Sequence, residues 1–204
     1  MTGRPMIWAV VLGAGESKRM GEPKVLLPYG EKTMIETVIE KTLDSRVDKT
    51  LVVLGSHWRK IGRIVKAYDV QITVNPRFRE GMLSSVQRGI SALPRSSRAA
   101  VIVLADQPGL SARVIDSLIS AYCRGKKGLV VPVYRKKRGH PLLIDLKYRQ
   151  EIGKLDPRIG LRQLLQRHPD DILEVKVSSP AVLSDIDTVQ DYMRSVAKKG
   201  RSAL

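Results

Sequence analysis

The order of elements along this chain predicts an α/β fold with a mostly parallel sheet, covered by helices on both faces in three layers. Two observations carry that prediction. Apolar runs typical of buried strands alternate with segments of helical spacing, and the 204 residues, 43% of them hydrophobic, suit one domain spanning 1–204. In such sheets ligands bind beyond the carboxyl ends of the strands. Polar residues that directly follow strands are therefore the candidate site residues.

Each element follows from its local pattern. Strands are expected where short runs are apolar and rich in β-branched residues, at 6–12, 50–54, 70–74, 99–105, 129–133, 141–144 and 173–177. Helices are expected where apolar residues recur with a period near 3.6, at 33–43, 58–66, 84–93, 111–122, 161–166 and 188–197. Pro94 stops one helix and Ser111 is a plausible N-cap of the next. The strand at 141–144 should pair after the basic turn around Gly139, and residues 198–204 should form a frayed tail.

A glycine-rich, basic turn follows the first strand and reads LGAGESKRMGEPK over residues 12–24. Glycine lets backbone N–H groups approach a ligand, and the N-terminus of a helix attracts anions, so this turn suits a polyphosphate that its cations would neutralise. It is not a Walker loop, because five residues separate Gly15 from Gly21 and Glu22 stands where Lys is required. It is not the dinucleotide fingerprint either, because Lys18 occupies the third glycine position.

Two acids stand where a divalent cation could be held. Asp106 directly follows the apolar run 99–105, and Asp187 precedes the last predicted helix. Transfer between phosphates brings anions together, and the usual remedy is a metal ion with basic side chains. Asp106 could instead be a turn or cap residue, and Asp187 an N-cap, whereas Asp185 is interpreted as structural.

Composition restricts the other function classes. The formal net charge is +16, but the cations are spread over the chain, and aromatic residues make up only 4%. Solvated surface charge is the best explanation for the excess of cations, followed by an anionic small-molecule site and then by nucleic-acid binding. Growth at high temperature would also favour many cations. No run is long and apolar enough for a membrane span or signal peptide, and Cys123 has no partner in the chain, so a cytoplasmic location without a membrane partner is expected.

The glycine-rich turn resembles the motif L-x-A/G-G-x-S-x-R-M-G-x-x-K of nucleotidyltransferases that activate small phosphates with an NTP. Further segments, A-D-Q-P around Asp106, D-I-D-T around Asp187, G-M-x-x-S ending at Ser85 and G-H-P around His140, are similar to motifs of the molybdenum cofactor cytidylyltransferases. The likeness extends over nearly the full length. It implies a Rossmann-like fold of the nucleotide-diphospho-sugar transferase type and an Mg²⁺-dependent reaction of CTP with molybdopterin that releases pyrophosphate.

The resemblance also implies roles for single residues. Asp106 and Asp187 would hold Mg²⁺, His140 would border the acceptor, and Ser85 would lie near the base. Arg19 and Lys24 would bind the triphosphate and stabilise charge during transfer. The nucleotide would also contact the first four residues of the turn, which are Leu12, Gly13, Ala14 and Gly15. A molybdoenzyme or a cofactor chaperone could receive the product.

One departure keeps alternatives open. Cytidylyl-transferring members read L-A-A-G and guanylyl-transferring members L-A-G-G, whereas this chain has Gly13 followed by Ala14. Ala14 favours CTP, but GTP or another NTP, with a different phosphorylated acceptor, is an alternative. A further alternative from another class is a basic nucleic-acid-binding protein without catalysis. The joint presence of Arg19, Lys24 and Asp106 argues against it, because a pure binder needs no metal-holding acid opposite a phosphate loop.

Overall fold

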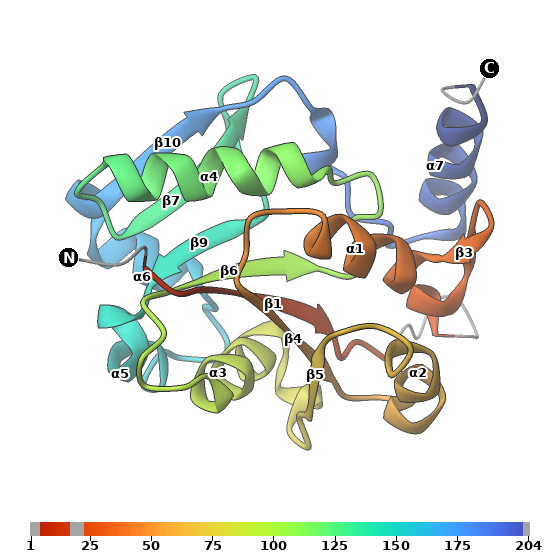
Figure 1. Ribbon diagram of the computed structural model, residues 1–204, viewed down its shortest axis with the longest axis horizontal. Coiled ribbons are helices and arrows are strands. Elements are labelled where there is room, and N and C mark those ends of the chain that lie inside the picture. Colours follow the sequence, from red (N-terminus) through yellow and green to blue (C-terminus); the bar gives the residue numbers. More distant parts are fainter. Residues whose placement is uncertain (1–4, 17–22, 202–204) are drawn as a thin grey trace.

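The computed structural model describes residues 5–16 and 23–201 and confirms the α/β class. Its main sheet has the order β10-β7-β9-β6-β1-β4-β5, with β8 paired to β7 (Figure 1). The strands are β1 (Ile7–Gly13), β4 (Lys49–Leu54), β5 (Gln71–Val74), β6 (Ala99–Leu104), β7 (Leu129–Tyr134), β8 (Lys137–Arg138), β9 (Leu142–Asp145) and β10 (Ile172–Lys176). A second, small sheet pairs β2 (Pro28–Tyr29) with β3 (Lys32–Thr33).

Most neighbours in the main sheet are parallel. β1 pairs in parallel with β4 on one side and β6 on the other, and Leu12 lies opposite Leu104. These strands therefore end at the same edge, which brings the residues that follow them together. β9 is antiparallel to both β6 and β7, so the expected pairing of 141–144 with 129–133 is confirmed.

Helices cover both faces of this sheet. One face packs against α1 (Met34–Leu43), α2 (Trp58–Val65) and α4 (Ala112–Arg124). The other face packs against α3 (Met82–Ala92), α5 (Arg149–Ile152) and α6 (Arg162–Arg167). The central strands β1, β4, β6 and β9 are almost wholly buried, as a sheet with two covered faces requires, whereas the edge strands β5, β8 and β10 are partly exposed. This is the predicted three-layer arrangement, with α1 and α4 on one side of the sheet and α3 and α5 on the other (Figure 1).

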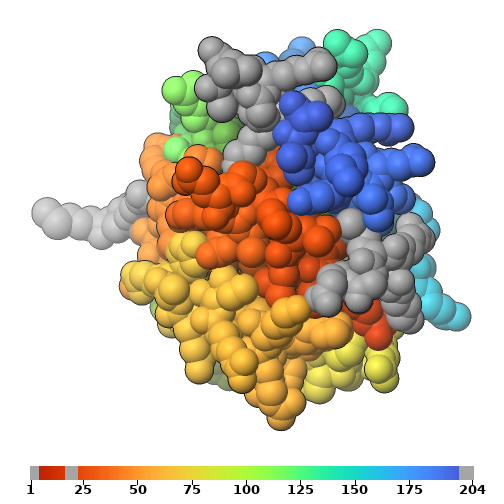
Figure 2. All heavy atoms as spheres, turned by 90° about the vertical axis from the view of Figure 1, so that its right-hand side faces the viewer, coloured from red at the N-terminus to blue at the C-terminus, as the bar shows by residue number. Residues whose placement is uncertain are grey.

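The last helix, α7 (Val189–Arg201), stands outside these layers. It packs on the small β2–β3 sheet through a separate apolar cluster of Tyr29, Met34 and Ile186, to which Tyr192 and Val196 contribute. Figure 2 shows α7 (blue) beside the red and orange segment that holds this small sheet and α1. Because α7 continues to Arg201, the first residues of the expected tail, 198–201, are helical. Among the described residues no helix is both long and apolar enough to cross a membrane.

The first residues of the helices can be compared with the caps and starts that the sequence predicts. Thr33 and Glu36 form a capping box at α1, and Thr188 and Asp191 form an equivalent reciprocal pair at α7. Ser111 occupies the N-cap position of α4, but its side chain makes no capping hydrogen bond. α3 begins two residues earlier than predicted, after Gly81, whose φ of 100° suits glycine.

Short 3₁₀ elements complete the fold. They are η1 (Lys24–Leu26), η2 (Phe78–Glu80), η3 (Leu146–Tyr148), η4 (Pro169–Asp171) and η5 (Pro180–Leu183). These one-turn segments, like two-residue strands, carry too few residues to show a period in the sequence. Two of them, η1 and η5, supply or support the residues of the candidate site.

Candidate functional site

The centre of the site is an ammonium group held between two carboxylates. Lys24 Nζ lies 2.6 Å from Asp106 Oδ2 and 2.8 Å from Asp187 Oδ1. The three residues are far apart in sequence: Lys24 begins η1, Asp106 follows β6, and Asp187 precedes α7. The structure thus brings together three of the residues that the sequence analysis singled out. Arg19, the fourth charged candidate, lies outside the described residues.

Burial determines the electrostatics of this group. The Lys24 side chain is only 14% exposed and that of Asp106 21%. Burial would lower the pKa of Lys24, but the charges of Asp106 and Asp187 together raise it above the ordinary value. Burial raises the pKa of Asp106, because the cost of desolvating this carboxylate exceeds the stabilisation that Lys24 provides.

Asp106 has one oxygen left over. Its Oδ1 is buried and has no hydrogen-bond partner, whereas Oδ2 accepts from Lys24. Within the described part of the chain, no three or more His, Cys, Asp or Glu side chains are grouped so that they could hold a metal ion. One or two carboxylates are nevertheless the usual protein contribution to a magnesium site, where phosphate and water oxygens complete the shell.

Asp187 is free of the capping role that the sequence left open. The α7 start is capped by Thr188 and Asp191 instead, since each side chain accepts from the other's backbone N–H at 3.1 Å. The backbone before Asp187 is tied to the sheet edge, because Ile186 N–H donates to the Asp106 carbonyl. Asp187 is 58% exposed and points its carboxylate at Lys24.

Asp185 contacts Gln107, the residue after Asp106. Gln107 Nε2 lies 2.5 Å from Asp185 Oδ1, and Gln107 is almost completely buried. Sequence reasoning interpreted Asp185 as structural, and this contact agrees with that interpretation. The pair was not predicted, because nothing in the spacing of residues 107 and 185 connects them.

The glycine turn lies beside this group, at the end of β1. Gly13 is the last residue of the strand, Leu12 and Ala14 are buried, and Gly15 is exposed. A Cβ added at Gly15 would meet no atom of residues 5–16 or 23–201 within 4 Å. Among the described residues, none therefore packs against this part of the turn.

A second glycine supports this turn from behind. A Cβ on Gly55, directly after β4, would lie 2.6 Å from the Ala14 carbonyl oxygen and 2.6 Å from Phe78 Cβ. The next residue, Ser56, donates its N–H to the same carbonyl at 3.3 Å. Only glycine permits this approach. A glycine that directly follows a strand was the available signal, but the sequence analysis assigned no role to Gly55.

Ser85 lies deeper than its expected role near the base suggests. It is 3% exposed on the inner side of α3, and its hydroxyl accepts from Asn75 Nδ2 at 3.0 Å. Asn75 is 1% exposed, follows β5, and donates to Ser84 as well. Neither serine caps α3, which starts after Gly81. The buried asparagine was missed, although an Asn-Pro pair at the end of a strand marks the ligand edge of the sheet.

His140 approaches the same site from the hairpin of β7 and β8. Its N–H donates to the Val182 carbonyl in η5, and a Cβ on Gly139 would lie 2.1 Å from that carbonyl oxygen. Burial lowers the pKa of His140 below its ordinary value, against the opposing charges of Asp185 and Asp106. The imidazole is therefore neutral at pH 7, and its buried Nδ1 has no partner.

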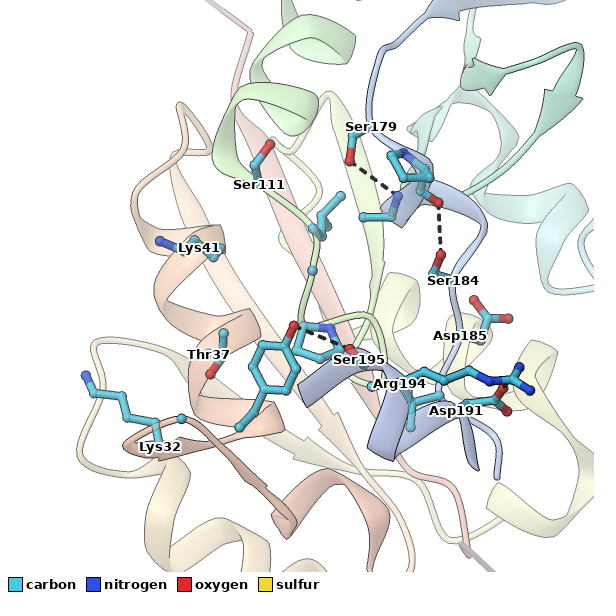
Figure 3. A pocket seen from close by; sticks show the side chains of 18 of the residues that line it. Lys32, Thr37, Lys41, Ser111, Ser179, Ser184, Asp185, Asp191, Arg194 and Ser195 are labelled. Atoms are coloured by element: carbon cyan, nitrogen blue, oxygen red, sulfur yellow. Dashed lines mark hydrogen bonds and ion pairs between the residues drawn. The ribbon is translucent and has the colours of Figure 1, made fainter. Parts of the chain in front are cut away.

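A groove of about 1040 Å³ lies on the outer side of the segment that carries Asp185 and Asp187. α1, the loop after Asp106, η5 and α7 form its walls, and Figure 3 shows Asp185 and Arg194 on the α7 side, across from Lys41 on α1. Its lining mixes serines with charged side chains and does not include Lys24 or Asp106. The groove is thus a neighbour of the candidate site, which it meets at Asp185.

Comparison with known proteins decides the family. A model of the MobA-like NTP transferase domain matches residues 9–172, which is most of the chain and includes Lys24, Asp106 and His140. The chain belongs to the MobA-like NTP transferase domain family. The suspected family is therefore confirmed, and with it the nucleotidyltransferase class of enzyme.

Relatives and solved structures agree over nearly the whole length. The nicotine blue oxidoreductase of Paenarthrobacter nicotinovorans is 29% identical over 95% of this chain and 98% of its own. The molybdenum cofactor cytidylyltransferase of Escherichia coli K12 is 24% identical over 90% and 92%. A crystal structure of the Rv0371c homolog from Mycobacterium sp. strain JC1 has a TM-score of 0.85 and 26% identity, covering 97% and 98% of the two chains.

Proposed function

We propose that this enzyme transfers CMP from CTP to a phosphorylated acceptor of the molybdopterin type and releases pyrophosphate, with Mg²⁺ as its metal. The observation that carries the proposal is the grouping of Lys24, Asp106 and Asp187 beside the glycine turn. A cation and two carboxylates at the carboxyl edge of a parallel sheet are what a metal-bridged triphosphate requires. The relative named for cytidylyl transfer in Escherichia coli supports the choice of nucleotide.

The residues present fit a hard divalent cation. Asp106 offers a buried oxygen without a partner, and Asp187 offers a second carboxylate that is more than half exposed. Oxygen ligands are what Mg²⁺ prefers, and the remaining positions would be filled by water and phosphate. When bound, such a cation would neutralise phosphate charge and polarise the phosphorus that is attacked.

The chain's own groups would bind the nucleotide and the acceptor. Backbone N–H groups of the turn from Gly13 to Gly15 would hold the nucleotide, and Lys24, with Arg19, would stabilise charge on the triphosphate. His140 would border the acceptor as a neutral side chain, in contact with the acceptor rather than as its general base. A phosphate monoester has its second pKa near 6, so an acceptor of this type is already ionised at neutral pH.

Other reactions make different demands on the site. GTP or another NTP with a different phosphorylated acceptor would use the same grouping, and Ala14 is the residue that favours CTP. A redox reaction like that named for the Paenarthrobacter relative would need a dinucleotide or flavin site. The G-x-G-x-x-G spacing is interrupted at Lys18, and no acid follows β4 at Leu54-Gly55-Ser56. A non-catalytic nucleic-acid-binding protein would not need the buried acid.

Pyrophosphate release tests the proposal. The wild-type protein is supplied with CTP, GTP or ATP, Mg²⁺ and a panel of phosphorylated acceptors, and separate reactions follow NADH and NADPH oxidation and salt-dependent DNA retention. We expect release with CTP and a molybdopterin-type acceptor. Turnover of a nicotinamide cofactor, or DNA retention without nucleotide turnover, would each contradict it.

The Asp106→Asn variant tests whether the activity depends on the proposed metal site. The variant should lose metal-dependent turnover by a factor of at least about 100, as removal of a group that stabilises transition-state charge typically does. Asp116→Asn, the same change on α4 at a side chain bound to Arg46, should have no effect. An unchanged metal titration in Asp106→Asn would remove Asp106 from the proposed metal site.

A further inference from the structure

The Lys24 ammonium lies between the carboxylates of Asp106 and Asp187, where a metal ion that bound both would also have to lie. The ammonium lies within hydrogen-bond distance of one oxygen from each carboxylate, at 2.6 Å and 2.8 Å. It thereby connects the segment after β6 to the segment before α7. Among the described side chains, no other cation is paired with either carboxylate.

A metal ion cannot use the same two oxygens while Lys24 stays there. Magnesium–oxygen ligand distances are about 2.0–2.1 Å, so an ion bound to both would lie within a few ångströms of the ammonium. Two like charges at that separation, beside the largely buried Lys24 and Asp106 side chains, repel each other strongly. The ammonium and the divalent cation are therefore alternatives at this pair of oxygens.

We propose that Lys24 competes with the divalent cation for Asp106 and Asp187, and that the cation binds tightly only when a triphosphate draws the Lys24 ammonium onto its own oxygens. The second half of this statement rests on the proposed nucleotidyl-transfer function. The first half concerns the chain's own side chains and stands without it.

Lysine is suited to such an exchange. Its charge is carried on a flexible four-carbon stem, and its three donors can turn from carboxylate to phosphate oxygens without a fixed planar geometry. Phosphate oxygens are charged acceptors of comparable strength, so the ammonium keeps charge-assisted hydrogen bonds in both positions. The carboxylates are likewise compensated in both states, first by Lys24 and then by the metal ion.

The exchange predicts an order of binding. Metal ion alone would have to displace the ammonium from both carboxylates, whereas a metal–triphosphate complex brings phosphate oxygens for the ammonium together with the ion. Lys24 would thus determine when the metal ion binds, in addition to binding phosphate. A cation that bound Asp106 Oδ1 alone would leave Lys24 in place, and this is the rival arrangement that the experiment must separate.

Mn²⁺ binding without nucleotide tests the competition directly. Electron paramagnetic resonance would measure free Mn²⁺ during titration of the wild type, Lys24→Met and Lys24→Gln. Removing the ammonium should tighten Mn²⁺ binding at least tenfold, although the same variants lose turnover. Adding Asp106→Asn to Lys24→Met should abolish the gain, which places the ion at this site.

Lys147→Met is the matched control. Lys147 forms an ion pair of 2.7 Å with Asp171, and its removal changes the net charge equally. It lies near the start of β6, where Asp145 pairs with Ala99, whereas Asp106 follows the end of that strand. Its Mn²⁺ affinity should equal that of the wild type. Unchanged or weaker Mn²⁺ binding in both Lys24 variants would overturn the competition, and equal tightening in Lys147→Met would reduce it to a net-charge effect.

The wild type alone gives a second measurement that needs no folded variant. Mg²⁺ alone should leave the unfolding temperature unchanged, whereas the same concentration of Mg²⁺ with tripolyphosphate should raise it. An equal rise with Mg²⁺ alone would contradict the exchange. Tightened Mn²⁺ binding in Lys24→Met without any pyrophosphate release by the wild type would instead leave the competition standing and refute the proposed function.

Discussion

Gly55→Ala should damage nucleotide binding from outside the site. The added Cβ would lie 2.6 Å from the Ala14 carbonyl oxygen and from Phe78 Cβ, and 2.9 Å from Ala14 Cβ. Ordinary contact begins at 3.4 Å, so the glycine turn must retreat by about 0.8 Å. Overpacking of this kind costs about 1–3 kcal/mol, and the hydrogen bond from Ser56 to the same carbonyl is lost with it.

The shift falls on the backbone that is proposed to hold the nucleotide. Misplacement by about 1 Å can reduce rates by about 100-fold, so we expect kcat/KM for the NTP to fall at least about tenfold. The larger part should appear in KM, because the turn binds rather than reacts. Steady-state kinetics with varied CTP measures this, and urea unfolding measures the accompanying loss of stability.

Gly62→Ala is the matched control. A Cβ there would have its nearest neighbour, Leu54 Cδ1, at 3.7 Å, which is ordinary contact, and alanine inside helix α2 should add about 0.5–1 kcal/mol of stability. Kinetics must be compared at a temperature where both variants are folded. If Gly55→Ala matched Gly62→Ala in nucleotide KM, the turn would not hold the nucleotide in the way proposed.

Three further substitutions test the packing and charges away from the reacting groups. Partial burial would raise the pKa of Asp171, but hydrogen bonds from Lys147 and two other donors lower it below its ordinary value. The contribution of Asp171 to the free energy of unfolding is therefore present above its unfolded-state pKa and is lost as pH falls through its folded-state pKa. Asp171→Asn should therefore cost about 1–2 kcal/mol at pH 7, and its difference from the wild type in urea unfolding should shrink below about pH 4; a difference that grows on acidification would contradict this. Thr188→Ala removes the α7 cap and should cost about 1 kcal/mol in the same assay, with a reduced CTP turnover if the cap also places Asp187. Gly89→Ala would put a Cβ 2.5 Å from a Val10 methyl group and should cost about 1–3 kcal/mol without raising the nucleotide KM.

Much of the fold could be predicted because its signals are local. The apolar run at 99–105 and the helical pattern at 111–122 correspond to β6 (Ala99–Leu104) and α4 (Ala112–Arg124). The misses share a physical cause. η1, β8 and α5 are four residues or fewer, too short for any period. Ser111 occupies the predicted N-cap position of α4 without a capping hydrogen bond, because a residue type indicates a cap position but not the geometry of its side chain.

The site was only partly predictable for a different reason. Lys24, Asp106 and Asp187 could be selected one by one, by motif and by their place near strand ends, but only the fold shows that one ammonium contacts both acids. Gly55 and the Gln107–Asp185 pair act through contacts with residues far along the chain, and Asn75 acts through serines nine and ten residues away. The place of Gly55 and Asn75 after strands is a local signal, but only the fold shows which atoms these side chains and backbones contact.

The sheet order explains why these distant residues meet. From β1 the chain first adds β4 and β5 on one side, then crosses to place β6 on the other side of β1. The strand order thus reverses at β1, and open parallel sheets bind their ligands outside the carboxyl ends of the strands at such a switch point. The glycine turn leaves β1 there and Asp106 leaves β6 beside it, with Leu12 and Leu104 in register. Lys24 and Asp187, the other two residues of the candidate site, come from segments outside the strands. A relative could therefore change its chemistry through these segments while keeping the sheet. Similar chains named for cytidylyl transfer and for a redox reaction are consistent with this view, and the activity of this chain is therefore best tested at the residues after the strands rather than inferred from the fold.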